Sequence, residues 1–92
     1  MWHLVWWFLG VLLVLGALTL VAIQSWVREQ ATQQTAYAEV IREHLDSGNY
    51  RVVAGVFTRR GQLQERTAWE CETIDQDLKN RFRGHDRFRM EV

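Results

Sequence analysis

An apolar run near the beginning of the chain constrains most strongly what this sequence can fold into. Residues 4–23 contain no charged side chain, no proline and a single hydroxyl, that of Thr19. A helix of these twenty residues would be about 30 Å long, which matches the hydrocarbon core of a bilayer. A cleaved signal peptide is disfavoured, because no Lys or Arg precedes the run and no small-residue cleavage site follows it. The run therefore predicts a transmembrane α-helix within an anchor of residues 1–26.

Tryptophan side chains lie near both ends of this predicted helix. Indole rings favour the headgroup level of a bilayer, where the ring stays in apolar surroundings and the N–H stays hydrated. The predicted membrane-interface residues are Trp2, Trp6, Trp7 and Trp26.

The distribution of charge sets the predicted orientation and localisation. All 11 basic and all 11 acidic residues lie at or after Arg28, so no positive charge precedes the apolar run. The positive-inside rule then favours a cytoplasmic C-terminal domain, and the small margin keeps a periplasmic or other extracytoplasmic location as the alternative. The sequence thus predicts a single-pass membrane protein with the lipid bilayer as one partner.

A second helix is expected directly after the anchor. Residues 24–46 contain no helix breaker, and the Ala, Gln and Glu residues there favour a juxtamembrane helix over residues 27–47. Small and apolar side chains recur in alternating steps of four and three, which is the spacing of a stripe on one helix face. This stripe would rest on the protein's own outer domain, on another membrane protein or on a second copy of the chain. The candidate partner stripe is Val27, Ala31, Ala38, Ile41 and Leu45.

Residues 48–92 are expected to form a small α+β outer domain. Residues 50–58 are rich in β-branched and aromatic side chains, and residues 63–72 alternate between apolar and polar, so a hairpin is predicted. A helix should begin at a capping box formed by Thr73 and Gln76 and should end at Gly84. A last strand over residues 87–92 completes the order strand, strand, helix, strand. The predicted core includes Trp69, Cys71 and Phe82, and is thin for a domain of this size.

No residue pattern in the chain predicts catalysis or a cofactor. Cys71 with His85 and Asp86 permits a nucleophile interpretation, but Cys71 falls on the apolar face of its predicted strand, which favours a buried small hydrophobe. The histidines at positions 3, 44 and 85 lack metal-site spacing, and no glycine-rich phosphate loop is present. A non-enzymatic protein without cofactor, metal or small-molecule substrate is therefore expected.

The leading functional hypothesis is a small accessory or adaptor subunit of a membrane or envelope complex. The alternative is a membrane-anchored binding module that contacts anionic lipid or nucleic acid through an arginine-rich C-terminal segment. Nucleic acid is the less expected partner, because acids equal bases in number and weaken any single-sign field. The candidate contact residues are Arg81, Arg83, Arg87 and Arg89.

Overall fold

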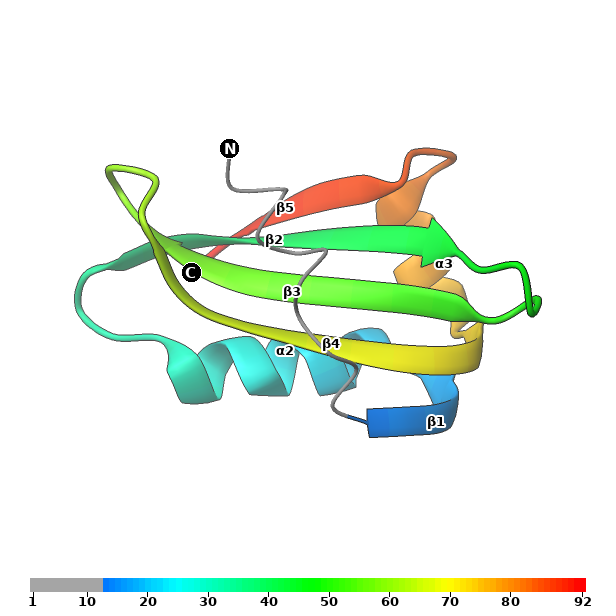
Figure 1. Ribbon diagram of the computed structural model, residues 1–92. Helices are drawn as coiled ribbons and strands as arrows, with labels where there is room; N and C mark the ends of the chain where they lie inside the picture. Colours follow the sequence, from blue (N-terminus) through cyan, green and yellow to red (C-terminus); the bar gives the residue numbers. More distant parts are fainter. Residues whose placement is uncertain (1–12) are drawn as a thin grey trace.

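The computed structural model describes residues 13–92, which form one five-stranded sheet and two helices (Figure 1). In chain order the elements are β1 (Leu13–Leu18), α2 (Leu20–Gln30), β2 (Thr35–His44), β3 (Tyr50–Thr58), β4 (Leu63–Ile74), α3 (Gln76–Phe82) and β5 (Arg87–Glu91). The order across the sheet is β1-β4-β3-β2-β5, and only the β1–β4 pair is parallel. The sheet curves into a half-barrel, and β1 and β5 are its edges.

Both helices pack on the same face of the sheet. Side chains of a strand alternate between faces, and those of Val52, Ala54 and Val56 in β3 belong to the main core. The helix residues of that core are Ile23, Val27, Leu78 and Phe82. A smaller cluster, centred on Val53, Phe57 and Ala68, contains no helix residue and lies on the opposite face. The fold is thus a curved sheet whose helix-covered face forms the principal core.

The predicted transmembrane helix is wrong. No helix within residues 13–92 is both long enough and apolar enough to cross a bilayer. Leu13–Leu18 instead form an edge strand whose register runs parallel to β4, from Trp69 to Ile74. Thr19 adopts an extended conformation, and its hydroxyl accepts a hydrogen bond from the Ala22 N–H, so this one polar residue ends the strand and begins α2. The membrane localisation and the single-pass architecture are overturned with the helix; residues 4–12 of the run lie outside the described residues.

The predicted juxtamembrane helix is also wrong. Helix α2 ends at Gln30, and β2 occupies Thr35–His44 in the middle of the segment that helix propensity favoured. Pairing explains the difference, because β2 has hydrogen-bonded neighbours on both sides and buries Ala38 and Val40 completely. Gly48 adopts φ 94° in the turn between β2 and β3, where the Leu45 N–H donates to the Asn49 carbonyl at 2.8 Å.

Residues 50–92 contain the expected elements within a different architecture. Strand β3 has the predicted bounds and Trp69 is a core residue with 8% exposure, as expected. These elements do not form a separate outer domain, because β1 and β2 belong to the same sheet, and the predicted fold class is therefore wrong. Asp75, rather than Thr73, caps α3: its Oδ1 accepts from the Leu78 N–H at 2.9 Å. The same oxygen accepts from the Leu20 N–H at 3.2 Å, which ties the beginnings of both helices together.

Candidate anion-binding surface

The end of α3 carries three basic residues, the last of them in a left-handed backbone conformation. Lys79 and Arg81 lie in its last turn, and Arg83 is the C-cap with φ 49° and ψ 47°. The Arg83 N–H donates to the Lys79 carbonyl at 3.0 Å, and Gly84 follows with φ 80°. Arg83 is the one non-glycine residue with positive φ among residues 13–92. The turn then leads directly into β5, which places the basic end of the helix beside the sheet edge.

Strand β5 presents its arginines on the face of β2 that carries Glu39. Arg87 and Arg89 are exposed and alternate with the half-buried side chains of Phe88 and Met90. Their guanidinium nitrogens lie 3.5 and 3.9 Å from Oε1 of Glu39, whose side chain is only 12% exposed. Glu39 thus compensates part of the charge of this pair of arginines.

Arg81 and Arg83 contact only neutral groups. Nη2 of Arg81 donates to the Arg89 carbonyl at 3.2 Å, and the Arg81 guanidinium lies 5.0 Å from the centre of the Phe88 ring. Nε of Arg83 donates to the Asn80 carbonyl at 3.2 Å. No carboxylate of the described residues forms an ion pair with either side chain. Two anchored guanidinium groups therefore keep uncompensated charge.

A hollow of about 330 Å³ lies next to these two guanidinium groups. It is lined by Asn80, Arg81, Arg83, Phe88 and Arg89, and none of these residues is acidic. A helix C-terminus has a partial charge of about −0.5, which one cation more than balances. Three cations at the end of a seven-residue helix leave a positive surplus, so the hollow favours an anion.

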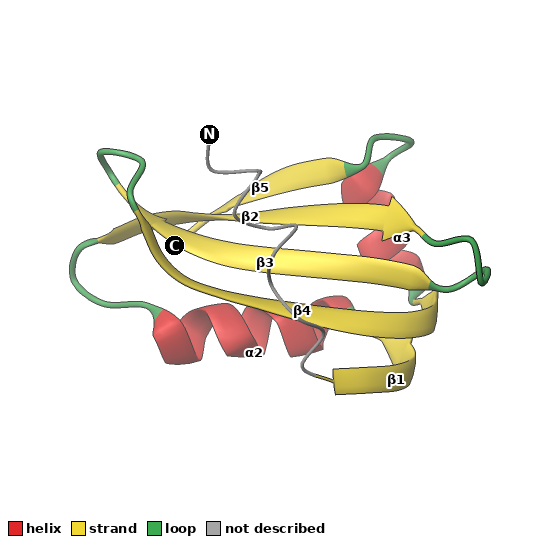
Figure 2. Ribbon diagram, viewed as in Figure 1, coloured by secondary structure: helices red, strands yellow, loops and turns green. Residues whose placement is uncertain are grey.

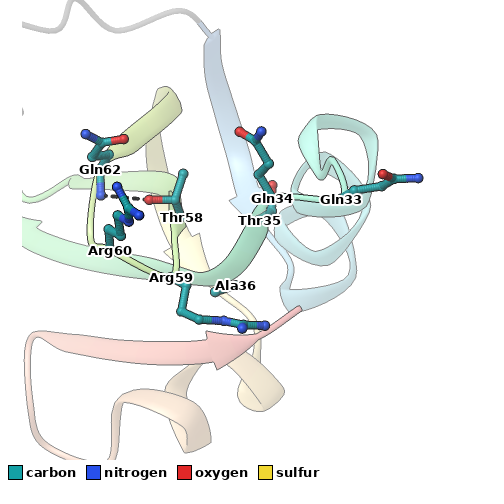
Figure 3. A pocket seen from close by; sticks show the side chains of 8 residues that line it. All are labelled: Gln33, Gln34, Thr35, Ala36, Thr58, Arg59, Arg60 and Gln62. Atoms are coloured by element: carbon teal, nitrogen blue, oxygen red, sulfur yellow. Dashed lines mark hydrogen bonds between the residues drawn. The ribbon is translucent and has the colours of Figure 1, made fainter.

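The α2–β2 connection and the β3–β4 turn lie at the other end of the sheet (Figure 2). A larger hollow of about 440 Å³ lies between them (Figure 3). Arg59 and Arg60 line it, together with glutamine and threonine side chains. Neither arginine has an ion pair or hydrogen bond with a described residue, and Figure 3 shows the two side chains leaving the turn in different directions. Sequence analysis did not single out this site; the signal was an Arg-Arg pair without adjacent acids, before a glycine that adopts φ 85°.

The candidate partner stripe does not lie on one surface. Val27 is buried in α2, and Ala31 is the extended C-cap of that helix. Ala38 and Ile41 are an odd number of residues apart in β2 and point to opposite faces, and Leu45 lies in the following turn. The helical spacing that grouped these five residues does not apply, and whether any of them meets a partner stays a prediction.

Trp26 is the one predicted membrane-interface tryptophan that lies within residues 13–92. Trp26 packs edge-on against Trp69, with ring centres 6.1 Å apart and an interplanar angle of 86°. Its ring thus contributes to the protein's own core. Trp2, Trp6 and Trp7 lie outside the described residues.

Cys71 lies in the main core and not in an open site. Its side chain is fully buried, and burial, with a smaller contribution from the charge of Glu70, raises the pKa of the thiol. A thiolate nucleophile requires the opposite shift. His85 and Asp86 lie exposed in the α3–β5 turn. The His85 carbonyl and the Asp86 carboxylate there accept hydrogen bonds from the Arg42 guanidinium. Within residues 13–92 no group of three His, Cys, Asp or Glu side chains could hold a metal ion.

Comparison with known proteins assigns the chain to no family. No family model, no curated protein and no solved structure matches it. Any proposal about its function therefore depends on the charge and geometry of the described residues.

Proposed function

We propose that this chain is a non-enzymatic binding protein that holds an anionic partner, a nucleic acid or an anionic lipid surface, against the end of α3 and β5. The observation that carries the proposal is the uncompensated charge of Arg81 and Arg83 beside a hollow without acidic residues. Arg87 and Arg89 lie on the same edge strand, but their side chains are on the face of the sheet opposite the helices, where Glu39 compensates part of their charge. We call these four residues the arginine surface.

The distribution of acids supports a local positive field in a chain of zero net charge. Glu65, Glu70 and Glu72 lie on β4, which two strands separate from β5. Strands in a sheet are about 4.8 Å apart, so roughly 14 Å separates β4 from β5. This distance exceeds the screening length of about 8 Å at physiological ionic strength. The acids of β4 are therefore largely screened from the arginine surface. The nearer acids are Asp77 in α3, Glu91 on β5, Asp86, which pairs with Arg42, and Glu39, which pairs with Arg87 and Arg89.

The test measures salt-dependent binding of the full chain to two phosphate-bearing probes. Fluorescence anisotropy with a labelled 12-nucleotide uridine RNA tests nucleic acid, and co-flotation with phosphatidylserine vesicles tests a lipid surface. We expect binding to one probe that weakens as salt rises, because counterions are released from the phosphates. The absence of binding to both probes at low salt would overturn the proposal.

A pair of matched variants locates the surface. Arg81→Gln with Arg83→Gln and Arg59→Gln with Arg60→Gln each remove two positive charges, at opposite ends of the sheet. The first double variant is expected to weaken binding about tenfold or more and to lower the salt slope by about 1 to 2. The second should bind almost as wild type. Equal losses would show that net charge, rather than the arginine surface, determines binding.

A second candidate function is an adaptor that pairs with a second copy of the chain through β5. The Arg42 N–H donates to the Asp86 carbonyl and the Val92 N–H to the Ala36 carbonyl, so even-numbered residues of β5 face β2. The backbone groups of Arg87, Arg89 and Glu91 therefore point away from the sheet. An antiparallel pair centred on Arg89 places Arg87 opposite Glu91 of the other copy, which complements their charges, and places the two Arg89 side chains opposite each other, which opposes pairing. A hollow of about 320 Å³ between α2 and β5, which includes the half-exposed Val92, adjoins this edge.

Solution mass distinguishes this adaptor from a monomeric binding protein. Arg89→Pro removes an N–H that β2 does not use, so it blocks edge pairing while the hydrogen bonds to β2 remain. Light scattering across a concentration series should give a dimer for the wild type and a monomer for Arg89→Pro. A wild-type monomer at high concentration would exclude the adaptor mode. Nη2 of Arg81 donates to the outward carbonyl of Arg89, so this carbonyl is already occupied and edge pairing is hindered. We rank the adaptor second for that reason.

A further inference from the structure

We propose that Asn80, Arg81 and Arg83 form a site for a single phosphate group in the hollow at the end of α3. This inference rests on the proposed function, and it narrows a general attraction for anions to one built site. The phosphate group can belong to free phosphate or to the headgroup of a phosphomonoester lipid, since both present the same acceptor oxygens.

The backbone conformation of Arg83 is the first argument for a built site. A left-handed C-cap is occupied most often by Gly or Asn, because a side chain with Cβ is strained there. Here the strained position holds an arginine, although a glycine follows immediately at Gly84. Nε of Arg83 caps the Asn80 carbonyl of the last turn, and the other four N–H donors of this guanidinium have no part in ending the helix. Strain retained at a charged residue beside a hollow points to a use for the side chain.

The hydrogen bonds of the three residues are the second argument. Each guanidinium has five N–H donors, and the described contacts anchor Arg81 and Arg83 through one nitrogen each. Oδ1 of Asn80 accepts from Gln76 Nε2 at 3.0 Å, which leaves the Asn80 amide nitrogen as a donor. The three side chains thus offer donors and no available charged acceptor. Phosphate oxygens accept hydrogen bonds, and guanidinium groups bind them bidentately.

The guanidinium groups at the end of α3 are held in place by contacts with described residues, whereas those of Arg59 and Arg60 are not. The Arg81 guanidinium lies over the Phe88 ring and bonds a carbonyl, so its position is fixed by two contacts. The Arg59 and Arg60 side chains have no such anchors among the described residues and diverge in Figure 3. Fixed donors lose less side-chain entropy on binding, and we therefore place the phosphate at α3.

The test compares binding and folding in the full chain. Calorimetric titration with inorganic phosphate at constant ionic strength measures the free ion, and flotation with phosphatidic acid vesicles measures the phosphomonoester headgroup. The variants are Arg83→Gly, Arg83→Lys and the control Arg66→Gln, an exposed arginine on β4. Thermal unfolding is recorded for each variant.

We expect Arg83→Gly to bind phosphate at least tenfold more weakly while its Tm is unchanged or higher, because glycine relieves the left-handed strain. Arg83→Lys should bind with intermediate affinity, and Arg66→Gln should bind as wild type. A lower Tm with unchanged phosphate affinity would show that Arg83 only caps the helix and would overturn the inference. Failure of the wild type to bind either probe would also overturn it, while RNA or phosphatidylserine binding that depends on Arg81 and Arg83 would leave the proposed function standing.

Discussion

The C-terminal ends of helices α2 and α3 differ in backbone conformation and in the number of basic residues. Helix α2 ends with Ala31 in an extended conformation, its N–H bonded to the Val27 carbonyl at 2.9 Å, and has Arg28 as the one basic residue of its last turn. Helix α3 ends with Arg83 in the left-handed region after two other basic residues. The longer helix, of eleven residues, is thus terminated with one cation, while the helix of seven residues carries three.

The helices are otherwise anchored alike. Each buries two side chains of its own span in the main core, with exposures between 0 and 3%. These are Ile23 and Val27 in α2, and Leu78 and Phe82 in α3. Anchoring therefore does not explain the arginines at the end of α3. The end of α3 thus carries two more basic residues than the end of α2, although Arg81 and Arg83 each donate one hydrogen bond to a backbone carbonyl.

The largest expected effect tests whether α3 is anchored as firmly as α2. Phe82 is 1% exposed, packs against Phe88 with ring centres 4.9 Å apart, and lies under the guanidinium of Arg42. Phe82→Ala should lower the free energy of unfolding by about 3–5 kcal/mol. Urea unfolding measures this, with the exposed Val21→Ala as the control, which should change stability by less than about 0.5 kcal/mol. A small loss for Phe82→Ala would show that α3 is only loosely docked.

The two helix N-caps give the next largest effect. Asp75→Ala removes an oxygen that bonds the N–H groups of Leu78 and Leu20, and should cost about 1–2 kcal/mol. Thr19→Ala removes one exposed bond, to the Ala22 N–H, and should cost about 0.5–1 kcal/mol. Denaturant unfolding of both variants checks the ranking. The reverse order would mean that Asp75 does not link the two helices.

Glycine substitutions at the two helix ends sharpen the comparison directly. Arg28→Gly introduces glycine into helical conformation and should lose about 1 kcal/mol. Arg83→Gly places glycine at φ 49°, where glycine is favoured, and should stay within about 0.5 kcal/mol of the wild type or exceed it. Thermal and urea unfolding under identical conditions measure both. Similar losses at the two positions would indicate that Arg83 is needed for folding.

The smallest effect comes from the buried thiol of Cys71. Burial raises its pKa, so the folded protein keeps the thiol proton at pH values where the unfolded chain loses it. The contribution of Cys71 to stability is present below the ordinary thiol pKa and is lost as pH rises through the raised folded pKa. Stability measured from neutral pH upward should therefore fall less steeply in Cys71→Ala than in the wild type. Parallel pH profiles would show that the thiol ionises equally well in both states.

The sequence predicts correctly those elements that depend on residues close together in the chain. The aliphatic and aromatic content of β3, the spacing of Ile74, Leu78 and Phe82, and the burial of Trp69 all follow from neighbouring residues. The first two strands do not: β1 pairs with β4, more than fifty residues away, and β2 is decided by neighbours on both sides. Non-local pairing overrode both the apolar run and the helix-favouring composition.

The four residues of the arginine surface were predicted together. The sequence did not predict that two of them pair with an acid of the described residues and two do not. Sequence spacing grouped Arg81, Arg83, Arg87 and Arg89 because they lie within one short segment. The β2–β5 register brings Glu39 to the last two and leaves the first two without an acid. That register was hidden because Glu39 had been assigned to a helix. The strained backbone of Arg83 likewise has no signature in the sequence.

The central claim is that the arginines at the end of α3 serve binding rather than folding. Amide NMR spectra of the full chain, recorded during a titration with inorganic phosphate at constant ionic strength, test it most directly. We expect saturable shifts confined to residues 79–84 and 88–89, beside the hollow, with residues 24–31 at the end of α2 unchanged. Saturable shifts centred on residues 58–62 instead, or equal small shifts at the ends of both helices, would contradict it.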